Sequence, residues 1–510
     1  MHRRRIHSEI VVLFSIILLS FSNASDVSLI SVIAVGVTWT VDDYGSANYS
    51  SIQQAINNAG DGDTILVNSG TYYEHLVVNK SLSIIGRDQS TTVIDGNRTW
   101  MTVVIDADDV TMKNLTIQHG TVGVILKEDR ERNMLSENRI VFNSYYGIYG
   151  DRCGKNIIAN NDVSFNFGRG IFLYGSKPCV IDSNSIFSNG VDGMFIHRSS
   201  NNTVKGNFVS RNDCGIYIYS DEDPERPSGL SKNNIIRDNH VLNNSCGIKL
   251  CHFGTDVSLA KNEIYNNSIA CNIVGLNMSR SNGNVFYNNN FVNNSEQLRV
   301  WESSNNTWDG GYYVGGNYWS DYNGSDLYWG PWQNEDGSDG IVDLPYLISA
   351  NAIAEDRYPF LHENGWRLVP EISIVSPVNG TFRSGTLALA LSTNKPVRVS
   401  YSLDNQPNVT VVGNLMLIDL PIGVHNLTVC AIDASGNEFS SKVVFTITFY
   451  ADLNLNGAVD LIDVFIIARS YGSSYGSEKW NPDADLNDDE RINLSDVLIV
   501  ARDFGKTIWK

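Results

Sequence analysis

The sequence contains few charged residues, few cysteines and, after its N-terminal leader, no apolar stretch long enough to span a membrane. Only 18% of its 510 residues are charged, and the formal net charge is −19. This acidic balance disfavours a general affinity for nucleic acid or anionic lipid, because both repel a negative protein surface. The seven cysteines are an odd number without paired metal spacings, which argues against a disulfide scaffold and against a zinc site.

Length and hydrophobic content set limits on the fold. A chain of 510 residues that is 42% hydrophobic is too long for one ordinary core and too apolar to be disordered, so we expect two to four domains. The acidic excess is unevenly distributed: residues 301–365 hold 11 acidic residues against 1 basic residue, and residues 451–510 hold 11 against 6. Cation binding is therefore the function to examine in these two segments.

The N-terminus has the three parts of a secretory signal. Residues 3–5 are arginines, residues 10–21 form an apolar run too short to span a bilayer, and residues 22–24 offer small side chains for cleavage. We expect residues 1–24 to be a signal peptide and the mature protein to be secreted or held at the cell surface. In the alternative, residues 27–37 extend the run into an uncleaved anchor, which would be the protein's membrane contact.

A repeat of 23 residues dominates the sequence from about residue 133 to residue 300. Two rows of asparagines and one row of glycines advance by this step, and after an insertion we expect the rows to resume. The first row is Asn138, Asn161, Asn184, Asn207, Asn239 and Asn262; the second is Asn143, Asn166, Asn189, Asn212, Asn244 and Asn267; the third is Gly147, Gly170, Gly193, Gly215 and Gly247.

This repeat predicts a parallel β-helix, so the expected fold class is all-β. Short β-branched runs are separated by asparagine and glycine, which tolerate the left-handed backbone of tight turns. Coils stacked about 4.8 Å apart would join each apolar row into one core and let turn asparagines hydrogen-bond along the stack. One such row is Ile140, Val163, Ile186, Val209, Val241 and Ile264. A leucine-rich repeat would need regularly spaced leucines, which this chain lacks.

The ends of this region carry a family resemblance. Residues 51–60 have the pattern of a short amphipathic helix that would cap the first coil, and strands are expected at residues 63–67, 70–72 and 82–86. This opening and the C-terminal motifs at residues 316–322 (GNYWSDY), 339–343 (DGIVD) and 356–359 (DRYP) resemble the right-handed parallel β-helix proteins of the NosD type. That family is also described as carbohydrate-binding and sugar-hydrolase domains.

The resemblance implies a right-handed β-helix over residues 38–365, with room for about eleven coils between residues 39 and 306. It also implies a polysaccharide or glycan ligand. Because the family includes binders, enzymes and members of unknown role, it does not decide whether the chain is an enzyme. An enzyme with this fold would be a polysaccharide lyase or a glycoside hydrolase.

Residues 366–449 have a different pattern. About seven short alternating segments, among them residues 387–391, 397–403, 415–420, 425–432 and 442–448, are separated by turns. They predict an immunoglobulin-like β-sandwich, which we interpret as a spacer domain. Cys430 has no cysteine partner within this segment, so the inter-sheet disulfide of antibody domains is missing.

The last segment, residues 450–510, contains one loop motif twice, 33 residues apart. Oxygen-bearing residues stand at the positions that a calcium loop requires, and each loop leads into an expected helix, at residues 463–472 and 496–505. The pair resembles a type I dockerin, which implies two Ca²⁺ ions and a cohesin-type domain on another protein as partner. The implied ligands are Asp452, Asn454, Asn456, Ala458 (carbonyl), Asp460 and Asp463, and then Asp485, Asn487, Asp489, Arg491 (carbonyl), Asn493 and Asp496.

Two features near these motifs carry further expectations. Glu490 occupies the sixth position of the second loop, where glycine is expected, so that loop should be strained or weaker. Upstream, Asp336, Asp339 and Asp343 have calcium-like spacing, although Gly337 offers no side-chain oxygen. A third Ca²⁺ ion and a solvated acidic turn are both open for this segment.

No catalytic motif is present in the β-helix region. Polar candidates on neighbouring coils are Asp192, His197, Arg198, Arg211, Asp213, Tyr217 and Lys249. The insertion at residues 220–229 should project from the stack. Together with Trp301, Trp308, Trp319, Trp329 and Trp332 it is a candidate sugar-contacting surface, unless these tryptophans cap the stack. Cys214 and Cys246 share one repeat position and could form a disulfide or stack as buried apolar groups.

Three functions are compatible with this sequence. The first is an exported protein that binds or processes polysaccharide and is attached to a surface or secreted assembly through its dockerin. The second is a non-catalytic adhesion or structural protein of the cell surface. The third is copper binding, which is disfavoured because the nine histidines and seven methionines form no cluster of soft ligands.

Overall fold

The computed structural model describes residues 36–45, 47–221, 230–253, 260–349, 354–411 and 415–508. The expected signal peptide and residues 222–229 of the insertion that we expected to project lie outside the described residues. The described part contains three long parallel sheets, four smaller sheets and a short helical segment at its C-terminal end. None of the described helices is long and apolar enough to cross a membrane.

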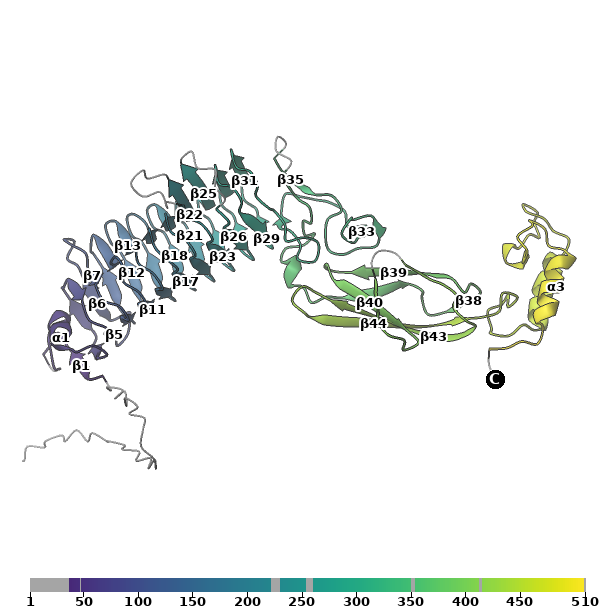
Figure 1. The fold of residues 1–510 in the computed structure, drawn as a ribbon, viewed down its shortest axis with the longest axis horizontal. Helices are drawn as coiled ribbons and strands as arrows, with labels where there is room; N and C mark the ends of the chain where they lie inside the picture. The colour runs from purple at the N-terminus through teal and green to yellow at the C-terminus, as the bar shows by residue number, and fades with distance from the viewer. Residues whose placement is uncertain are drawn as a thin grey trace, which may run out of the picture. The chain divides into compact units, whose positions relative to one another are not determined.

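The three long sheets form a parallel β-helix, which confirms the expected fold class. They hold 11, 10 and 11 strands, and each coil contributes one strand to each sheet. In one coil these strands are β14 (Ile157–Ala159), β15 (Asp162–Ser164) and β16 (Ile171–Tyr174), and each pairs in parallel with the strand one coil later. Figure 1 shows the coils following one another from β7 to β31.

Along each long sheet the strand numbers advance by three, except at one end of the first sheet and one end of the third. The first sheet contains β1 (Thr38–Val41), β2 (Thr64–Val67), β5 (Ser83–Gly86), β8 (Thr111–Lys113), β11 (Met134–Ser136), β14, β17 (Val180–Asp182), β20 (Thr203–Lys205), β23 (Ile235–Arg237), β26 (Glu263–Tyr265) and β29 (Val285–Tyr287). The second contains β4 (Leu76–Val78), β7 (Val103–Ile105), β10 (Val122–Leu126), β13 (Tyr146–Asp151), β16, β19 (Asp192–His197), β22 (Cys214–Asp221), β25 (Cys246–Phe253), β28 (Val274–Ser279) and β31 (Glu296–Trp301). The third contains β3 (Gly70–Tyr72), β6 (Thr92–Asp95), β9 (Thr116–Gln118), β12 (Arg139–Val141), β15, β18 (Ser185–Phe187), β21 (Phe208–Ser210), β24 (His240–Leu242), β27 (Ser268–Ala270), β30 (Asn290–Val292) and β32 (Tyr318–Trp319).

The first coil is covered by the expected helix, α1 (Ile52–Asn58). Its apolar side, including Ile52 and Ile56, is fully buried. Its N-terminus is fixed by the carboxylate of Glu74, which accepts hydrogen bonds from the backbone N–H groups of Ile52 (2.9 Å) and Gln53 (2.9 Å). A carboxylate at this end also complements the positive end of the helix dipole. The helix therefore closes the edge that the first strands would otherwise expose.

Three columns of buried asparagine side chains run along the turns of the coils. In each column the backbone N–H and the Nδ2 of one asparagine donate to the Oδ1 of the asparagine one coil later. For Asn161 and Asn184 both N···O distances are 2.9 Å. The glycine row beside the columns is required sterically, because a Cβ on Gly147 would lie 2.7 Å from the carbonyl oxygen of Gly170. These contacts explain the 23-residue spacing of both residue types.

The expected alignment of the columns is wrong beyond residue 239. Asn239 donates to Asn267 rather than to Asn262, and Asn244 donates to Asn272. Asn262 belongs to a third column, in which it accepts from Asn234. The apolar row shifts in the same way, since Val241 pairs with Ile269. The physical reason is a coil of 28 residues, which the 23-residue step did not anticipate.

One asparagine column ends on an aspartate. Asn289 donates to Asn317, and the backbone N–H and Nδ2 of Asn317 donate to Oδ2 of Asp356, at 2.7 and 3.1 Å. The indole Nε1 of Trp319 donates to the same oxygen at 2.9 Å. Every amide in the column donates toward this end, so the last group must accept hydrogen bonds, as a carboxyl group does. Burial raises the pKa of Asp356 to about 7.

The remaining elements follow the β-helix. The short hairpins β33 (Tyr328–Trp329) with β34 (Glu335–Asp336), and β35 (Tyr346–Ser349) with β36 (Ala354–Asp356), precede two sheets that share one core. One sheet contains β37 (Ile372–Ser376), β39 (Leu387–Thr393) and β42 (Leu415–Leu417). The other contains β38 (Thr381–Phe382), β44 (Glu438–Ile447), β43 (Gly423–Ile432), β40 (Arg398–Leu403) and β41 (Val409–Val411). This is a two-sheet sandwich; its immunoglobulin-like character stays a prediction.

Removing one asparagine from the middle of a column should destabilise the β-helix. In Asn184→Ala, the N–H and Nδ2 of Asn161 lose their common acceptor in a buried position. We expect a loss of roughly 3–5 kcal/mol in the free energy of unfolding, measured by chemical denaturation, because each unsatisfied buried group costs about 1–3 kcal/mol. The exposed Asn323 provides the control, and Asn323→Ala should change the value by less than about 0.5 kcal/mol. Equal values for both variants would contradict the role of the columns.

The buried acid at the end of the column should make stability fall with rising pH. Asp356 keeps its proton in the folded protein up to a pKa of about 7, whereas the unfolded chain releases it near the ordinary value of 3.8. The folded state therefore binds more protons between these values, and we expect the melting temperature to decrease from about pH 4 to about pH 7. Asp356→Asn keeps an acceptor oxygen and should make this decrease smaller, while the buried Asp339 keeps its own contribution. An unchanged slope in the variant would show that Asp356 is not its source.

Candidate functional site

One face of the β-helix carries two adjoining columns of aromatic side chains, all of them half-buried except Phe195, which is buried at 7% exposure. Successive strands β13, β16, β19 and β22 place Tyr149, Phe172, Phe195 and Tyr217 in one register column. Their ring centroids are 5.1, 5.1 and 4.9 Å apart. Beside them, a second column holds Tyr174, His197 and Tyr219, with centroids 5.2 and 4.9 Å apart. We call these seven side chains the aromatic strip.

Charged groups surround the aromatic strip as ion pairs. Nε of Arg169 lies 2.7 Å from Asp192, and its guanidinium carbon lies 4.1 Å above the Phe195 ring. Nε of Arg198 lies 2.6 Å from Asp221, and the same carboxylate accepts a hydrogen bond from Nε2 of His197 at 2.8 Å. Each cation is thereby fixed in position and neutralised by a carboxylate.

Burial and these pairs shift several pKa values. Burial raises the pKa of Asp192, and the hydrogen bond from Arg169 offsets this only in part. Burial also lowers the pKa of His197, against the opposing hydrogen bond to Asp221. For Asp221, burial acts upward, but the hydrogen bonds from Arg198 and His197 outweigh it and hold the pKa below its usual value.

The structure brings most of the polar candidates to this face. Asp192, His197, Tyr217 and Lys249 lie in or beside the strip, and Nζ of Lys249 lies 4.4 Å above the Tyr217 ring. Arg211 instead occupies a turn before β22, with a left-handed backbone (φ 55°). The sequence reasoning missed the partners Arg169 and Asp221 and most of the rings. The spacing of 23 between Tyr149, Phe172 and Phe195 was the signal that could have found them.

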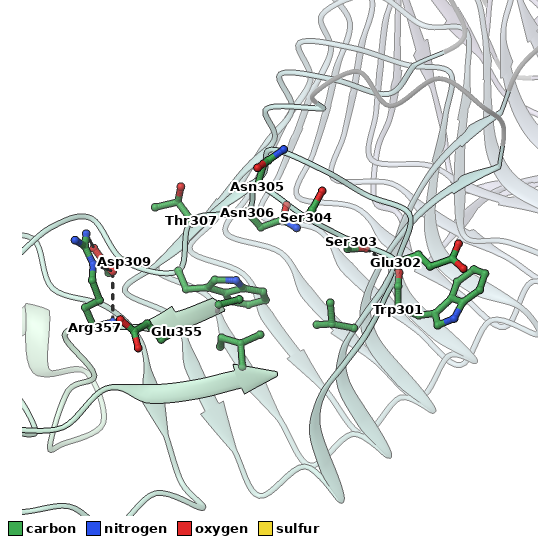
Figure 2. A pocket seen from close by; sticks show the side chains of 14 residues that line it. Trp301, Glu302, Ser303, Ser304, Asn305, Asn306, Thr307, Asp309, Glu355 and Arg357 are labelled. Atoms are coloured by element: carbon green, nitrogen blue, oxygen red, sulfur yellow. Dashed lines mark hydrogen bonds and ion pairs between the residues drawn. The ribbon is translucent and has the colours of Figure 1, made fainter. Parts of the chain in front are cut away.

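A pocket of about 860 Å³ lies where the strip's face reaches the last coils, lined by Trp301, Glu302, Asp309, Glu355 and Arg357 among others. Figure 2 shows the ion pair of Asp309 and Arg357 on one side of this pocket. Trp301 lies on the opposite side. This ion pair is bidentate, with N···O distances of 2.8 and 2.9 Å. Glu302 is paired with Arg280 at 2.7 Å, and the guanidinium of Arg280 lies over the Trp301 ring.

The five candidate tryptophans have different positions. Trp308 and Trp319 are buried and stack on Phe286 and Phe291, with centroids 4.5 and 4.3 Å apart. They therefore cap the core, as the alternative interpretation held, and Trp329 is also buried. The sugar-contacting expectation is wrong for these three because their rings are inaccessible. Trp301 and Trp332 are exposed, at 52% and 85%.

The cysteine pair stacks without a bond. Cys214 and Cys246 are in register on β22 and β25, and all seven cysteines are free thiols. Burial raises the pKa of Cys214 well above its usual value, so its thiol is protonated and behaves as a small apolar group. The structure therefore contains the second of the two expected alternatives.

The two C-terminal loops fold in the same way. The first-position carboxylates, Asp452 and Asp485, accept the backbone N–H of the sixth residue at 2.8 Å in both loops. The twelfth-position carboxylates, Asp463 and Asp496, accept the N–H of the second residue at 2.8 Å. Helices α2 (Leu461–Ser470) and α3 (Leu494–Asp503) begin two residues earlier than expected, because Asp460 and Asn493 cap them.

The donor chemistry of these loops fits a hard divalent cation. Asp452, Asp463 and Asp496 are fully buried, and within the described chain none of the six loop aspartates has a lysine or arginine partner. Asparagine side chains and a backbone carbonyl complete each oxygen set. In the described part, no three Asp, Glu, His or Cys side chains converge on a metal position, since the loop carboxylates are engaged by backbone N–H groups. The individual ligands therefore stay predictions.

The third calcium position is not supported by the geometry. Asp339 is fully buried and accepts from the Tyr312 hydroxyl (2.8 Å) and from Nε2 of Gln333 (2.8 Å). Asp336 is exposed, and Asp343 accepts the backbone N–H of Leu327 at 3.0 Å. These three carboxylates serve separate contacts and do not converge on one metal position within the described residues.

Three family models match segments of this chain. Residues 101–264 match the right handed beta helix region, residues 228–324 match the periplasmic copper-binding protein (NosD), and residues 450–505 match the dockerin type I domain. The chain carries a right-handed β-helix and a type I dockerin. Both resemblances drawn from the sequence are thereby confirmed. Type I dockerins generally bind calcium, in agreement with the donor sets of the two loops.

Individual relatives are distant. Halomucin of Haloquadratum walsbyi is 33% identical over 97 residues, which is 18% of this chain and 1% of halomucin, so the chain spans a very small part of that relative. An alginate lyase of Paenibacillus sp. str. FPU-7 superposes with a TM-score of 0.36 and 13% identity over 53% of this chain and 98% of its own. A mannuronan C-5 epimerase A-module of Azotobacter vinelandii superposes with a TM-score of 0.36 and 14% identity, over 50% of this chain and 92% of its own. At these TM-scores neither likeness carries a conclusion about this chain.

Replacing Glu490 should strengthen the second loop of the dockerin. Glu490 has the left-handed φ of 61° that Gly457 adopts in the first loop, at 83°. Since a non-glycine residue loses about 1 kcal/mol or more in this conformation, we expect Glu490→Gly to tighten the weaker calcium affinity about fivefold, measured by titration calorimetry of the full chain. The matched control, Gly457→Ala, should weaken the other site. An unchanged affinity in Glu490→Gly would contradict strain at this position.

Proposed function

We propose that this protein is exported, binds polysaccharide along the aromatic strip of its β-helix, and is attached by its dockerin to a cohesin-type domain of a surface or secreted assembly. The proposed domains are a signal peptide at residues 1–24, the β-helix at 38–365, a spacer sandwich at 366–449 and the dockerin at 450–510. Two Ca²⁺ ions in the dockerin loops are part of this proposal.

The aromatic strip is the observation that carries the glycan-binding proposal. Its rings are spaced by one coil and tilted by 30–53° to one another, and together they form an apolar surface that extends along the stack. The C–H faces of pyranose rings pack on such surfaces, while the hydroxyls of Tyr217 and Tyr219 supply polar contacts. The amide of Asn277, two coils beyond Tyr217 in the same column, supplies another. An extended sugar chain is therefore the ligand whose shape fits the strip.

The dockerin surface supports the attachment proposal. Helix α2 exposes Leu461 and Phe465, at 72% and 69%, and helix α3 exposes Leu494 and Leu498, at 60% and 59%. These pairs occupy equivalent positions in the two repeats. Large apolar side chains on short helices mark a surface for another protein, because each apolar group left in water costs free energy. A cohesin-type domain is the partner that the dockerin match supports.

Truncating the aromatic strip should abolish glycan binding without unfolding the protein. We expect Tyr217→Ala combined with Tyr219→Ala to weaken retention on the bound polysaccharide by at least about tenfold in affinity electrophoresis. The matched control is Tyr265→Ala, which removes a ring stacked at 4.9 Å on Tyr287 on a different sheet. Equal loss in both variants, or no retention of the unmodified protein on any polysaccharide, would contradict the proposal. Release of sugar or of unsaturated product would identify an enzyme rather than a binder.

Calcium should bind the full chain at two sites that depend on the loop carboxylates. Asp463 is buried and holds its loop through three backbone N–H groups, so Asp463→Ala should reduce the calcium stoichiometry from two to one and lower the melting temperature of the dockerin. The exposed Glu478 lies outside both loops, and Glu478→Ala should retain both ions. A stoichiometry that is unaffected by Asp463→Ala would exclude the first loop as a calcium site.

A further inference from the structure

The class of polysaccharide can be inferred from the charges beside the aromatic strip. Cations on this face are matched by carboxylates from one end of the sheet to the other, in the part of the chain that the structure describes. The pairs are Lys127 with Asp106 (2.6 Å), Arg152 with Glu128 (2.6 Å), Arg169 with Asp192 (2.7 Å), Arg198 with Asp221 (2.6 Å), Arg280 with Glu302 (2.7 Å), and Arg299 with Glu296.

Lys249 is the exception among the described residues of this face. Its ammonium group lies over the Tyr217 ring, where the ring face attracts it. The charge of Lys249 lowers the pKa of Asp192, whereas the charge of Asp213 raises it. Lys249 therefore has the carboxylates of Asp192 and Asp213 near it. One ammonium group in these surroundings can bind sugar hydroxyls, but it cannot match a chain that carries one carboxylate on every sugar.

The pocket at the last coils also lacks an unpaired cation among its described lining residues. It is lined by the carboxylates of Glu302, Asp309 and Glu355 and by the single cation Arg357, which Asp309 already binds through two hydrogen bonds. Segment 301–365 as a whole carries 11 acidic residues against 1 basic residue. A polyanion that followed the strip to this end would meet a negative surface.

We infer that the ligand of the aromatic strip is an uncharged polysaccharide, and that the protein rejects polyuronates and sulfated glycans. This inference rests on the proposed glycan-binding function and adds its substrate class. Rings supply the attraction for pyranose faces, and the ion pairs fix polar groups that exchange hydrogen bonds with neutral hydroxyls. Releasing a cation to bind a uronate would leave Asp192 or Asp221 without its partner in a half-buried or buried position, which is costly.

The test compares the full chain on immobilised cellulose, xylan and galactomannan with the full chain on alginate and polygalacturonate. We expect retention on a neutral polysaccharide, with an affinity that changes less than about twofold between low and high salt because no net charge attraction contributes. Salt-sensitive retention on a polyuronate, with none on neutral chains, overturns the inference and leaves the binding function standing. Retention on none of the five overturns the binding function itself.

Two variants test the cause of this selectivity. Asp192→Asn and Glu302→Gln each release one arginine, Arg169 or Arg280, from its carboxylate. We expect each variant to gain polyuronate affinity at least about threefold, with a dependence on salt that the unmodified protein lacks. Glu302 is in an exposed pair, so this variant keeps the test valid if Asp192→Asn fails to fold. Polyuronate affinity that stays unchanged in a folded variant overturns the inference that pairing sets the selectivity.

Discussion

The amide-to-amide hydrogen bond between asparagines one coil apart is the constraint on which the β-helix depends. Each such asparagine gives its neighbour a single acceptor for two donors, as Asn184 does for Asn161, so the coils can stack in one register only. Three columns of this kind fix the corners of the coils from Asn133 onward, with Cys179 taking one column position. Because the backbone N–H and one amide N–H of each asparagine point toward the C-terminal end, the column that reaches Asn317 is completed by the carboxyl group of Asp356.

Because of this register, residues at the same position of successive repeats lie next to one another on one face of the β-helix. Once the coils are aligned, Tyr149, Phe172 and Phe195 lie above one another without any turn or loop to position them. The same alignment brings Arg169 to Asp192 on the next coil, which neutralises the charges between the rings. The aromatic strip and its ion pairs are therefore consequences of the stack, and the glycan-binding and neutral-ligand proposals rest on the asparagine columns.

The fold could be predicted wherever the sequence repeats, and the site only in part. The 23-residue step between Asn138, Asn161 and Asn184 and the duplicated dockerin loops both follow from local spacing, and both were found. The 23-residue step assigned Asn262 to the wrong column, because a 28-residue coil shifts every later position. The partners Arg169 and Asp221 were missed, since a pairing across coils depends on side-chain direction. Burial of Trp308 and Trp319 depends on where the stack ends, which spacing alone does not reveal.

The central claim is that coils held in register present one extended strip to one extended sugar chain. Its most direct test is the affinity of neutral oligosaccharides of increasing length for the full chain, measured by titration calorimetry. Because each added sugar can cover about one further ring at a spacing of about 4.8 Å, the account predicts that affinity rises with length and then levels off once the strip is covered. An affinity that is already complete for a disaccharide, and does not rise for longer chains, would contradict it.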